Sequence, residues 1–473
     1  MTTLAPTFGD NPIRTAEEDW LERAASASAL AALLQRPGLD LPLTIGAYGD
    51  WGCGKTSLLQ MVNRQLSDEH LVIWFNAWAY SQQRDALWRA FLLAIISRFR
   101  APDFQAHVLD DRALAHMLAD DPTPRVAIAA QLDQQLTRLE TSLYRSKVYR
   151  ERTGYDISWE AVAMLGARTA LRLVPGLGGE LAKTLESQTG EGHDVKDLFG
   201  VLKAREREEL REHTQSIEQF RGEFANLIHS YVNAAGRRLI CFVDDLDRCL
   251  PEDAVGVLEA IKIFFDCGDG APLNCAFVLG MDRRVVEQGI SVRYASFTQT
   301  GASHIDAGQY LDKIIQIPFA VPPLSTAQIE RFARRWCATY QPELERCVPL
   351  IAAGVAPNPR GVKRTLHTLS LVSTTRAAMQ LPTSPEALAL LTKIIVIQTS
   401  YESVYRELAR QPGIIQELER ASAEGGDPSV DAAHAALLAA YPRLRAMLRR
   451  TPQFPSDPAR AQELLANLLY YHE

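Results

Sequence analysis

The chain has 473 residues, of which 47% are hydrophobic, so it is long enough for two or three compact units with buried cores. Its 50 Lys and Arg residues against 57 Asp and Glu residues give a net charge of −7, so it has no global basic field of the kind that marks nucleic-acid binders. The seven cysteines show no C-x-x-C spacing, which argues against a zinc site and favours reduced thiols in a cytosol. No basic stretch followed by an apolar run opens the sequence, so a secretory signal is not expected.

The first predicted elements are a helix and a strand. A capping-box pattern predicts a helix from Thr15 to Pro37, with Glu18 or Asp19 as the acidic partner. The apolar run 43–48 then predicts a buried strand. The run is followed by G-x-x-x-x-G-K-T-S at 49–57 and then by apolar residues at helical spacing. This order is typical of a P-loop between a strand and a helix.

The P-loop pattern indicates a site for ATP or GTP. Glycines let backbone N–H groups turn inward around phosphate oxygens, the start of the helix adds a positive dipole, and Lys55 adds a point charge. We expect Thr56 to hold Mg²⁺ through its hydroxyl group. The residues expected to contact the nucleotide here are Gly49, Asp50, Trp51, Gly52, Cys53, Gly54, Lys55, Thr56 and Ser57.

Strands that alternate with helices favour an α/β fold with a parallel sheet. Beyond the P-loop, strands are predicted at 71–75, 239–243, 275–279 and 314–317. Between about residues 101 and 235 the strand signals give way to an all-helical insertion. Its last part carries a seam that we expect to pack on the core rather than on a partner, formed by Leu210, Ile217, Phe220, Phe224, Leu227 and Tyr231.

From Leu324 onward the pattern is helical. The main helices are predicted at 329–340, after Pro359, and at 385–408. We place a domain boundary at Pro322 and Pro323. Residues 1–322 would then form the P-loop NTPase domain with its helical insertion, and residues 323–473 a helical C-terminal domain.

Two adjacent carboxylates follow the predicted strand 239–243. An acid at the end of a buried strand can reach Mg²⁺ through water while its neighbour orients an attacking water, so we assign Asp244 to the metal and Asp245 to catalysis. Capping of the next turn is the alternative for this pair, and it is favoured for Asp247. Asp282, after the next strand, either senses the γ-phosphate or caps the following helix, and both interpretations stay open.

Basic residues supply the remaining candidates. The segment 358–364 begins a helix with three cations, and we expect Arg360 to reach the phosphates; an exposed basic helix face is the alternative. Candidates for an arginine finger, acting in cis or from another subunit, are Arg248, Arg283 and Arg284. The predicted catalytic residues are Lys55, Asp245, Asp282 and Arg360.

Taken together, these motifs resemble the KAP family of P-loop NTPases. The resemblance spans about residues 10–370 and rests on D-N-P-I at 10–13, G-D-W-G-C-G-K-T-S at 49–57, F-N-A-W at 75–78, D-D-L-D-R-C at 244–249, Y-L-D-K-I-I at 310–315 and N-P-R at 358–360. It implies an ASCE-type three-layer core related to the STAND and AAA groups. It also implies that Pro12 and Ile13 line the adenine.

Many KAP proteins carry transmembrane helices between the P-loop and the acidic strand, and this chain departs from that pattern. The nearest candidate, 159–173, is shorter than the roughly 20 apolar residues that a span needs, and it contains Glu160, Arg168 and Arg172. We interpret it as an amphipathic helix packed on the core, with attachment to a membrane surface as the alternative. A cytoplasmic protein is therefore expected, with peripheral membrane association left open.

The motifs and the resemblance predict a Mg²⁺-dependent ATPase whose hydrolysis resets a conformational switch, with helical regions that bind protein partners. ATP is favoured over GTP because no N-K-x-D segment is present and because of the family. Many bacterial KAP proteins look like parts of multi-subunit phage-exclusion systems, which implies a role in antiviral defence. The alternative is a non-catalytic scaffold with a structural nucleotide; homo-oligomerisation and stimulation by nucleic acid stay open.

Overall fold

A computed structural model describes residues 11–66, 70–81, 87–104, 125–153, 220–265, 272–298, 306–381, 384–423 and 432–457, together with residues 460 and 464. The chain divides into two compact units. The sheet unit consists of Leu33–Ala47 and Leu66–Phe319. The P-loop unit consists of Met1–Ala32, Tyr48–Gln65 and Ala320–Glu473. The domain boundary predicted at Pro322 and Pro323 stays a prediction.

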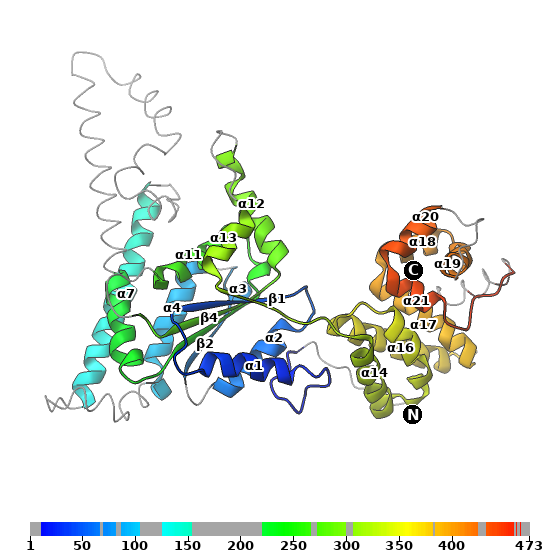
Figure 1. Cartoon of the computed structure of the whole chain (residues 1–473), viewed down its shortest axis with the longest axis horizontal. Coiled ribbons are helices and arrows are strands. Elements are labelled where there is room, and N and C mark those ends of the chain that lie inside the picture. The colour runs from blue at the N-terminus through cyan, green and yellow to red at the C-terminus, as the bar shows by residue number, and fades with distance from the viewer. Residues whose placement is uncertain are drawn as a thin grey trace, which may run out of the picture. The chain divides into compact units, whose positions relative to one another are not determined.

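A five-stranded parallel sheet forms the centre of the sheet unit (Figure 1). Its strands are β1 (Leu43–Tyr48), β2 (Leu71–Asn76), β3 (Leu239–Asp244), β4 (Cys275–Met281) and β5 (Ile317–Ala320), in the spatial order β2-β3-β4-β1-β5. Every residue of β1, β3 and β4 is buried, as expected for strands of a parallel sheet that is covered on both faces. The predicted α/β class is therefore confirmed.

Helices surround this sheet within the same unit. They are α3 (Ala77–Tyr80), α4 (Leu87–Arg100), α7 (Arg125–Thr153), α11 (Pro251–Phe265), α12 (Arg283–Thr298) and α13 (Ala307–Ile314), with a π-helix η2 (His229–Asn233) and a 3₁₀-helix η3 (Leu246–Arg248). The helix α4 contacts β2 and α11, and α7 packs against α4 (Figure 1). Two further helices, α1 (Ala24–Gln35) and α2 (Lys55–Leu66), flank β1 in the sequence.

Most of the described residues of the insertion are helical. The part of the predicted seam that falls on described residues is buried, namely Phe220, Phe224, Leu227 and Tyr231. The prediction that the seam packs within the chain is therefore confirmed for these four residues. Leu210, Ile217 and the segment 159–173 lie outside the described residues. Within the described part of the chain, no helix is long and apolar enough to cross a membrane.

The helix predicted from Thr15 begins at Ala24 instead, so that prediction was wrong. The acidic residues that suggested a capping box serve the turns ahead of the helix: Glu18 accepts a hydrogen bond from the backbone N–H of Arg14 at 2.8 Å, and Asp19 accepts one from that of Ala24 at 2.7 Å. Glu22 has a left-handed φ of 59°, which a helix does not contain.

The strand predicted at 314–317 was also displaced. Ile314 is the last residue of α13, and β5 runs over Ile317–Ala320. Pro318 therefore lies inside a strand, which the sheet tolerates because β5 is at its edge. Gln316 joins this edge to β1, since its backbone N–H donates to the Thr44 carbonyl at 3.1 Å and its side chain accepts from the Thr44 N–H at 2.7 Å.

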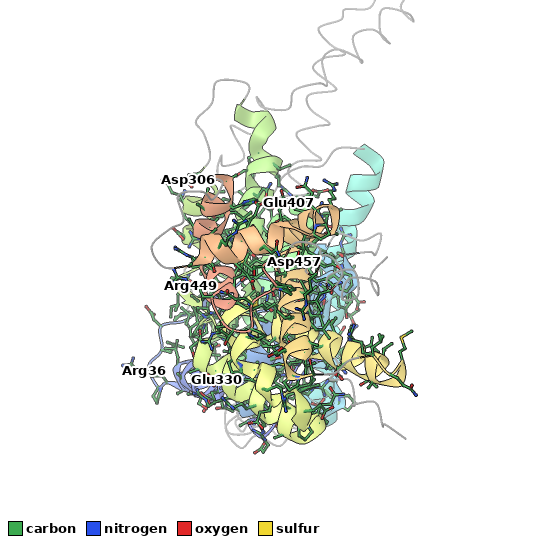
Figure 2. All side chains as sticks on the ribbon, turned by 90° about the vertical axis from the view of Figure 1, so that its right-hand side faces the viewer. Arg36, Asp306, Glu330, Glu407, Arg449 and Asp457 are labelled. Carbon is green, nitrogen blue, oxygen red and sulfur yellow. The ribbon has the colours of Figure 1, made fainter. Side chains whose placement is uncertain are left out.

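The C-terminal part of the P-loop unit is helical, as predicted. Its helices are α14 (Thr326–Tyr340), η4 (Pro342–Cys347), α15 (Val348–Gly354), α16 (Pro359–Ala378), α17 (Pro385–Ser400), α18 (Glu402–Arg410), α19 (Ile414–Ser422), α20 (Ala432–Ala440) and α21 (Pro442–Leu448). The helical segment predicted at 385–408 contains α17 and most of α18, which are separated where the backbone leaves the helical conformation at Tyr401. Glu407 on α18 and Arg449, directly after α21, are among the exposed charged residues of this part of the chain (Figure 2).

Local sequence explains why α14 forms where it does. Ser325 and Gln328 make a capping box, in which each side chain bonds to the backbone N–H of the other residue. The buried residues then recur at helical spacing, namely Ile329, Phe332, Ala333, Trp336 and Cys337. The helix thus begins at a specific cap and presents one apolar face to the core that these helices share.

A buried ion pair lies inside this helical core. The ammonium group of Lys393 on α17 donates to a carboxylate oxygen of Glu419 on α19 at 2.6 Å, and their side chains are 0% and 5% exposed. Lys393 also donates to the Leu448 carbonyl at 3.2 Å, and the second Glu419 oxygen accepts from the Phe454 N–H at 2.9 Å. The pair therefore joins α17 and α19 to the last residue of α21 and to the chain after it.

Removing one partner of the Lys393–Glu419 pair should destabilise the chain much more than replacing both partners. We expect Lys393→Ala and Glu419→Ala each to lower the free energy of unfolding by about 3–5 kcal/mol, because each leaves a buried charge without its counter-ion. The double variant Lys393→Met/Glu419→Leu should stay close to the parent chain. Urea unfolding measures these free energies. The control is Arg334→Ala, which removes an arginine that takes part in exposed ion pairs. A double variant as unstable as either single one would contradict the expectation.

Candidate functional site

The P-loop, residues 49–56, leads from β1 into α2 in a conformation that depends on its glycines. Gly52 and Gly54 have φ values of +81° and +96°, which L-residues rarely adopt. Gly49 is required for a different reason: a Cβ atom there would lie 2.5 Å from the sulfur of Cys53. The loop therefore folds tightly on itself, as its sequence predicts.

Lys55 is the first residue of α2, and its side chain bends back over the loop. Its ammonium group donates to the Gly49 carbonyl at 2.6 Å and to the Asp50 carbonyl at 3.4 Å, and the residue is buried. Ser57, in the same turn of α2, accepts a hydrogen bond from the backbone N–H of Ile13 at 3.3 Å. The N-terminal segment thus reaches the first turn of α2.

Arg23 contacts the P-loop and was not among the predicted site residues. Its guanidinium donates to the Cys53 carbonyl at 3.2 Å, and burial lowers its pKa. Burial also raises the pKa of the Cys53 thiol, so this thiol stays protonated. One signal for Arg23 in the sequence is its position four residues after Asp19. In the structure, the Asp19 carboxylate accepts hydrogen bonds from the backbone N–H groups of Leu21 and Ala24, on either side of Arg23.

The first turn of α16 also contacts the P-loop. The Asn358 amide donates to the Trp51 carbonyl at 3.3 Å, and the backbone N–H of Arg360 lies 3.4 Å from the Gly52 carbonyl. A Cβ atom at Gly52 would approach the Cβ of Arg360 to 2.9 Å. The guanidinium carbon of Arg360 is 5.9 Å from the centre of the Trp51 ring. Arg360 therefore lies at the P-loop.

In the sheet unit, the acidic pair follows β3. Asp244 is the last residue of that strand, is completely buried, and is aligned with Asn76 at the end of β2. Asp245 has a left-handed φ of 60° and precedes η3. Its carboxylate accepts a hydrogen bond from the Asn76 amide at 3.1 Å and pairs with Arg248 at 2.9 Å.

Asp282 follows β4 and is buried. Its carboxylate accepts a hydrogen bond from the backbone N–H of Arg284 at 3.0 Å, so it caps α12. This contact agrees with the capping interpretation of Asp282, and its catalytic role stays a prediction.

Among the candidate arginine fingers, Arg283 forms ion pairs within the sheet unit. It pairs with Glu287 at 2.6 Å and with Asp312 at 3.0 Å.

The P-loop domain of the KAP family matches residues 23–100 and 125–375, which is more than half of the chain. The chain belongs to the KAP family. Its P-loop and D-D-L-D-R-C segment are therefore those of a P-loop NTPase family, which supports nucleotide binding.

Solved structures also match this KAP chain, whereas no curated protein does. A Walker-type ATPase of Pyrococcus abyssi has 12% sequence identity and a TM-score of 0.34, over 97% of this chain and 91% of that chain. The ORC2 protein of Aeropyrum pernix, solved in ADPNP–ADP complexes, has 13% identity and a TM-score of 0.33, over 95% of this chain and 86% of that chain.

The KAP motifs thus fall into two sets. The P-loop unit brings together the loop, Ile13 and Arg360, whereas the sheet unit holds Asp244, Asp245 and Asp282. Among the described residues, no group of three or more His, Cys, Asp or Glu side chains could hold a metal ion. The described cysteines are free thiols, namely Cys53, Cys241, Cys249, Cys275, Cys337 and Cys347.

Two glycine variants separate backbone strain from packing against α16. Gly52 and Gly236 both have left-handed φ values, but a Cβ at Gly236 would meet no atom within 4 Å. We expect Gly236→Ala to cost about 1 kcal/mol of stability through strain alone. Gly52→Ala should lower the stability further, because its Cβ atom would also displace Arg360 from the loop.

Hydrogen–deuterium exchange should report this difference locally. Protection of the Arg360 amide is expected to fall in Gly52→Ala and to stay unchanged in Gly236→Ala. Equal protection in both variants would show that the contact between α16 and the loop is unimportant.

Proposed function

We propose that this KAP chain is a Mg²⁺-dependent ATPase whose cycle of binding and hydrolysis drives a conformational switch. The observation that carries the proposal is the pair of motifs in one parallel sheet: a glycine-shaped P-loop with Lys55 after β1, and a buried acidic pair after β3. Ligands of open α/β sheets bind at the carboxyl ends of the strands. Both motifs follow such ends.

The chemistry needs positioning and electrostatics rather than covalent catalysis. Lys55 and the backbone N–H groups from Gly49 to Ser57, including those of Asp50, Trp51, Gly52, Cys53, Gly54 and Thr56, would bind the phosphates. Pro12 and Ile13 would lie against the adenine, a role that the hydrogen bond from Ile13 to Ser57 supports. ATP is preferred to GTP because the sequence has no N-K-x-D guanine-recognition segment.

Mg²⁺ would be held by the Thr56 hydroxyl and, through water, by Asp244. Hydroxyl and carboxylate oxygens are the hard ligands that this ion takes, and it is usually bound by few protein groups together with phosphates. When bound, the ion neutralises charge on the phosphates. Asp245 would orient the attacking water, with Asp282 and Arg360 as sensors of the γ-phosphate.

The switch would run from the P-loop into the C-terminal helices. Asn358 and Arg360 bond to carbonyls of the loop itself, so a change in loop conformation on nucleotide binding acts directly on the first turn of α16. The helical regions are then the parts that move or bind protein partners. By its family, the chain would serve a cytoplasmic, multi-subunit antiviral defence system, as a homo-oligomer or with other subunits.

Two variants test the assignment of ATP binding and hydrolysis. We expect Lys55→Ala to abolish tight ATP binding, because it removes the point charge at the phosphates, and Lys262→Ala, an exposed lysine, to leave binding unchanged. Isothermal titration with ATP and Mg²⁺ measures both. Unchanged affinity in Lys55→Ala would contradict the predicted phosphate site.

Asp245→Asn should retain ATP and trap it. The expected loss in the single-turnover rate is roughly 10²- to 10⁴-fold, as for other general acid–base residues, whereas Asp247→Asn should hydrolyse ATP normally. Radiolabelled ATP under single-turnover conditions measures the rate. Normal hydrolysis by Asp245→Asn would refute the catalytic assignment, and no hydrolysis by the unaltered chain would favour the non-catalytic scaffold.

A further inference from the structure

Asp245 is held at both oxygens of its carboxylate. One oxygen accepts a hydrogen bond from the Asn76 amide at 3.1 Å, and the other pairs with a terminal nitrogen of Arg248 at 2.9 Å. Only 12% of the side chain is exposed. Two contacts from different elements on so small a group leave it little freedom to rotate.

The backbone brings Arg248 to this place. The left-handed φ of 60° at Asp245 turns the chain directly into η3, so that Arg248, three residues later, faces the carboxylate. Aspartate tolerates this conformation better than most residues, although glycine is usual in it. The Cys249 thiol also lies 3.7 Å from the Asp245 carbonyl, on the same turn.

Arg248 is itself held by an aromatic ring. Its guanidinium carbon lies 5.5 Å from the ring centre of Trp78 on α3, within the range of a cation–π contact. Trp78 belongs to the short helix that Asn76 caps, since the Asn76 side chain accepts from the Ala79 N–H at 3.0 Å. Both contacts on Asp245 therefore depend on the same turn between β2 and α3.

From this arrangement we infer that Arg248, fixed against Trp78, is a positioning residue for Asp245 within its own chain. The inference rests on the proposed function, in which Asp245 orients the attacking water. Such a carboxylate must be held to within about 0.5 Å, and neighbouring side chains supply that constraint. This assigns to Arg248 a different role from that of an arginine finger inserted into the site of another subunit.

The rate and the affinity should respond differently to loss of Arg248. In Arg248→Ala we expect the single-turnover rate to fall roughly 10- to 100-fold, the range for small misplacements of a catalytic group, while ATP affinity stays unchanged. Millimolar guanidinium ion should restore part of the rate, and Arg248→Lys should be intermediate because it keeps the charge but not the planar group. Arg334→Ala, in exposed ion pairs, should match the parent chain.

Trp78 provides a second, independent variant. Trp78 is 47% exposed, so Trp78→Ala should fold, and it should lower the rate by freeing Arg248. In the Arg248→Ala background, Trp78→Ala should have no further effect, because its action passes through Arg248. Additive losses, or a normal rate in Trp78→Ala, would overturn this part of the inference.

Mixing subunits separates positioning in cis from a finger in trans. If Arg248 acted as a finger in trans, Lys55→Ala subunits would still carry it. They would supply it to the ATP sites of Arg248→Ala subunits, and the mixture would hydrolyse ATP. A positioning residue cannot be supplied in this way, and the mixture should stay as slow as Arg248→Ala alone. Recovery on mixing would therefore overturn the inference.

The two proposals fail in distinguishable ways. If the unaltered chain hydrolyses ATP and Arg248→Ala does so at the same rate, the positioning role is refuted while the ATPase function stands. If the unaltered chain binds ATP without hydrolysing it, the proposed function fails and the role of Arg248 fails with it.

Discussion

The complete burial of the central strands is the constraint on which the rest of the structure depends. β1, β3 and β4 expose none of their residues, and burying a polar group that lacks a partner costs free energy, so between their ends these strands carry mostly apolar side chains, with Thr44 on β1 as an exception. The charged side chains gather where the strands end. Asn76, Asp244 and Asp282 stand at or directly after the ends of β2, β3 and β4, and the P-loop follows β1. Burial thus concentrates the chemistry at the strand ends.

The shape of the P-loop depends on residues far from it in the sequence. The carbonyls of Trp51, Gly52 and Cys53 accept hydrogen bonds from the segment before α1 or from the first turn of α16. Protein groups therefore satisfy these carbonyls, and the contacts constrain the backbone of the loop. The same contacts make the N-terminal segment, the loop and the C-terminal helices parts of one unit.

Arginines illustrate why residue type alone does not assign a role. Arg23 and Arg248 are both close to motif residues, but their guanidinium groups donate to a carbonyl of the loop and to the Asp245 carboxylate. Arg283 is likewise engaged by Glu287 and Asp312. Any of them could be taken from the sequence as a phosphate contact, because a guanidinium suits carboxylate, carbonyl and phosphate oxygens alike.

The sequence by itself determined the P-loop, the acidic pair, the order of strands and helices along the chain, and the family. These features depend on short-range patterns: apolar runs, apolar residues at helical spacing, and the spacing of glycines and Lys55 in the P-loop. It misplaced the start of α1 and the position of β5, where a left-handed Glu22 and an edge proline altered the local pattern. Only the tertiary structure decided that Arg23 and α16 meet the loop, and that Asn76 and Trp78 after β2 contact Asp245 and Arg248 after β3. Those contacts join segments distant in sequence, and a pairing of this kind depends on where the fold brings each backbone, which no local pattern records.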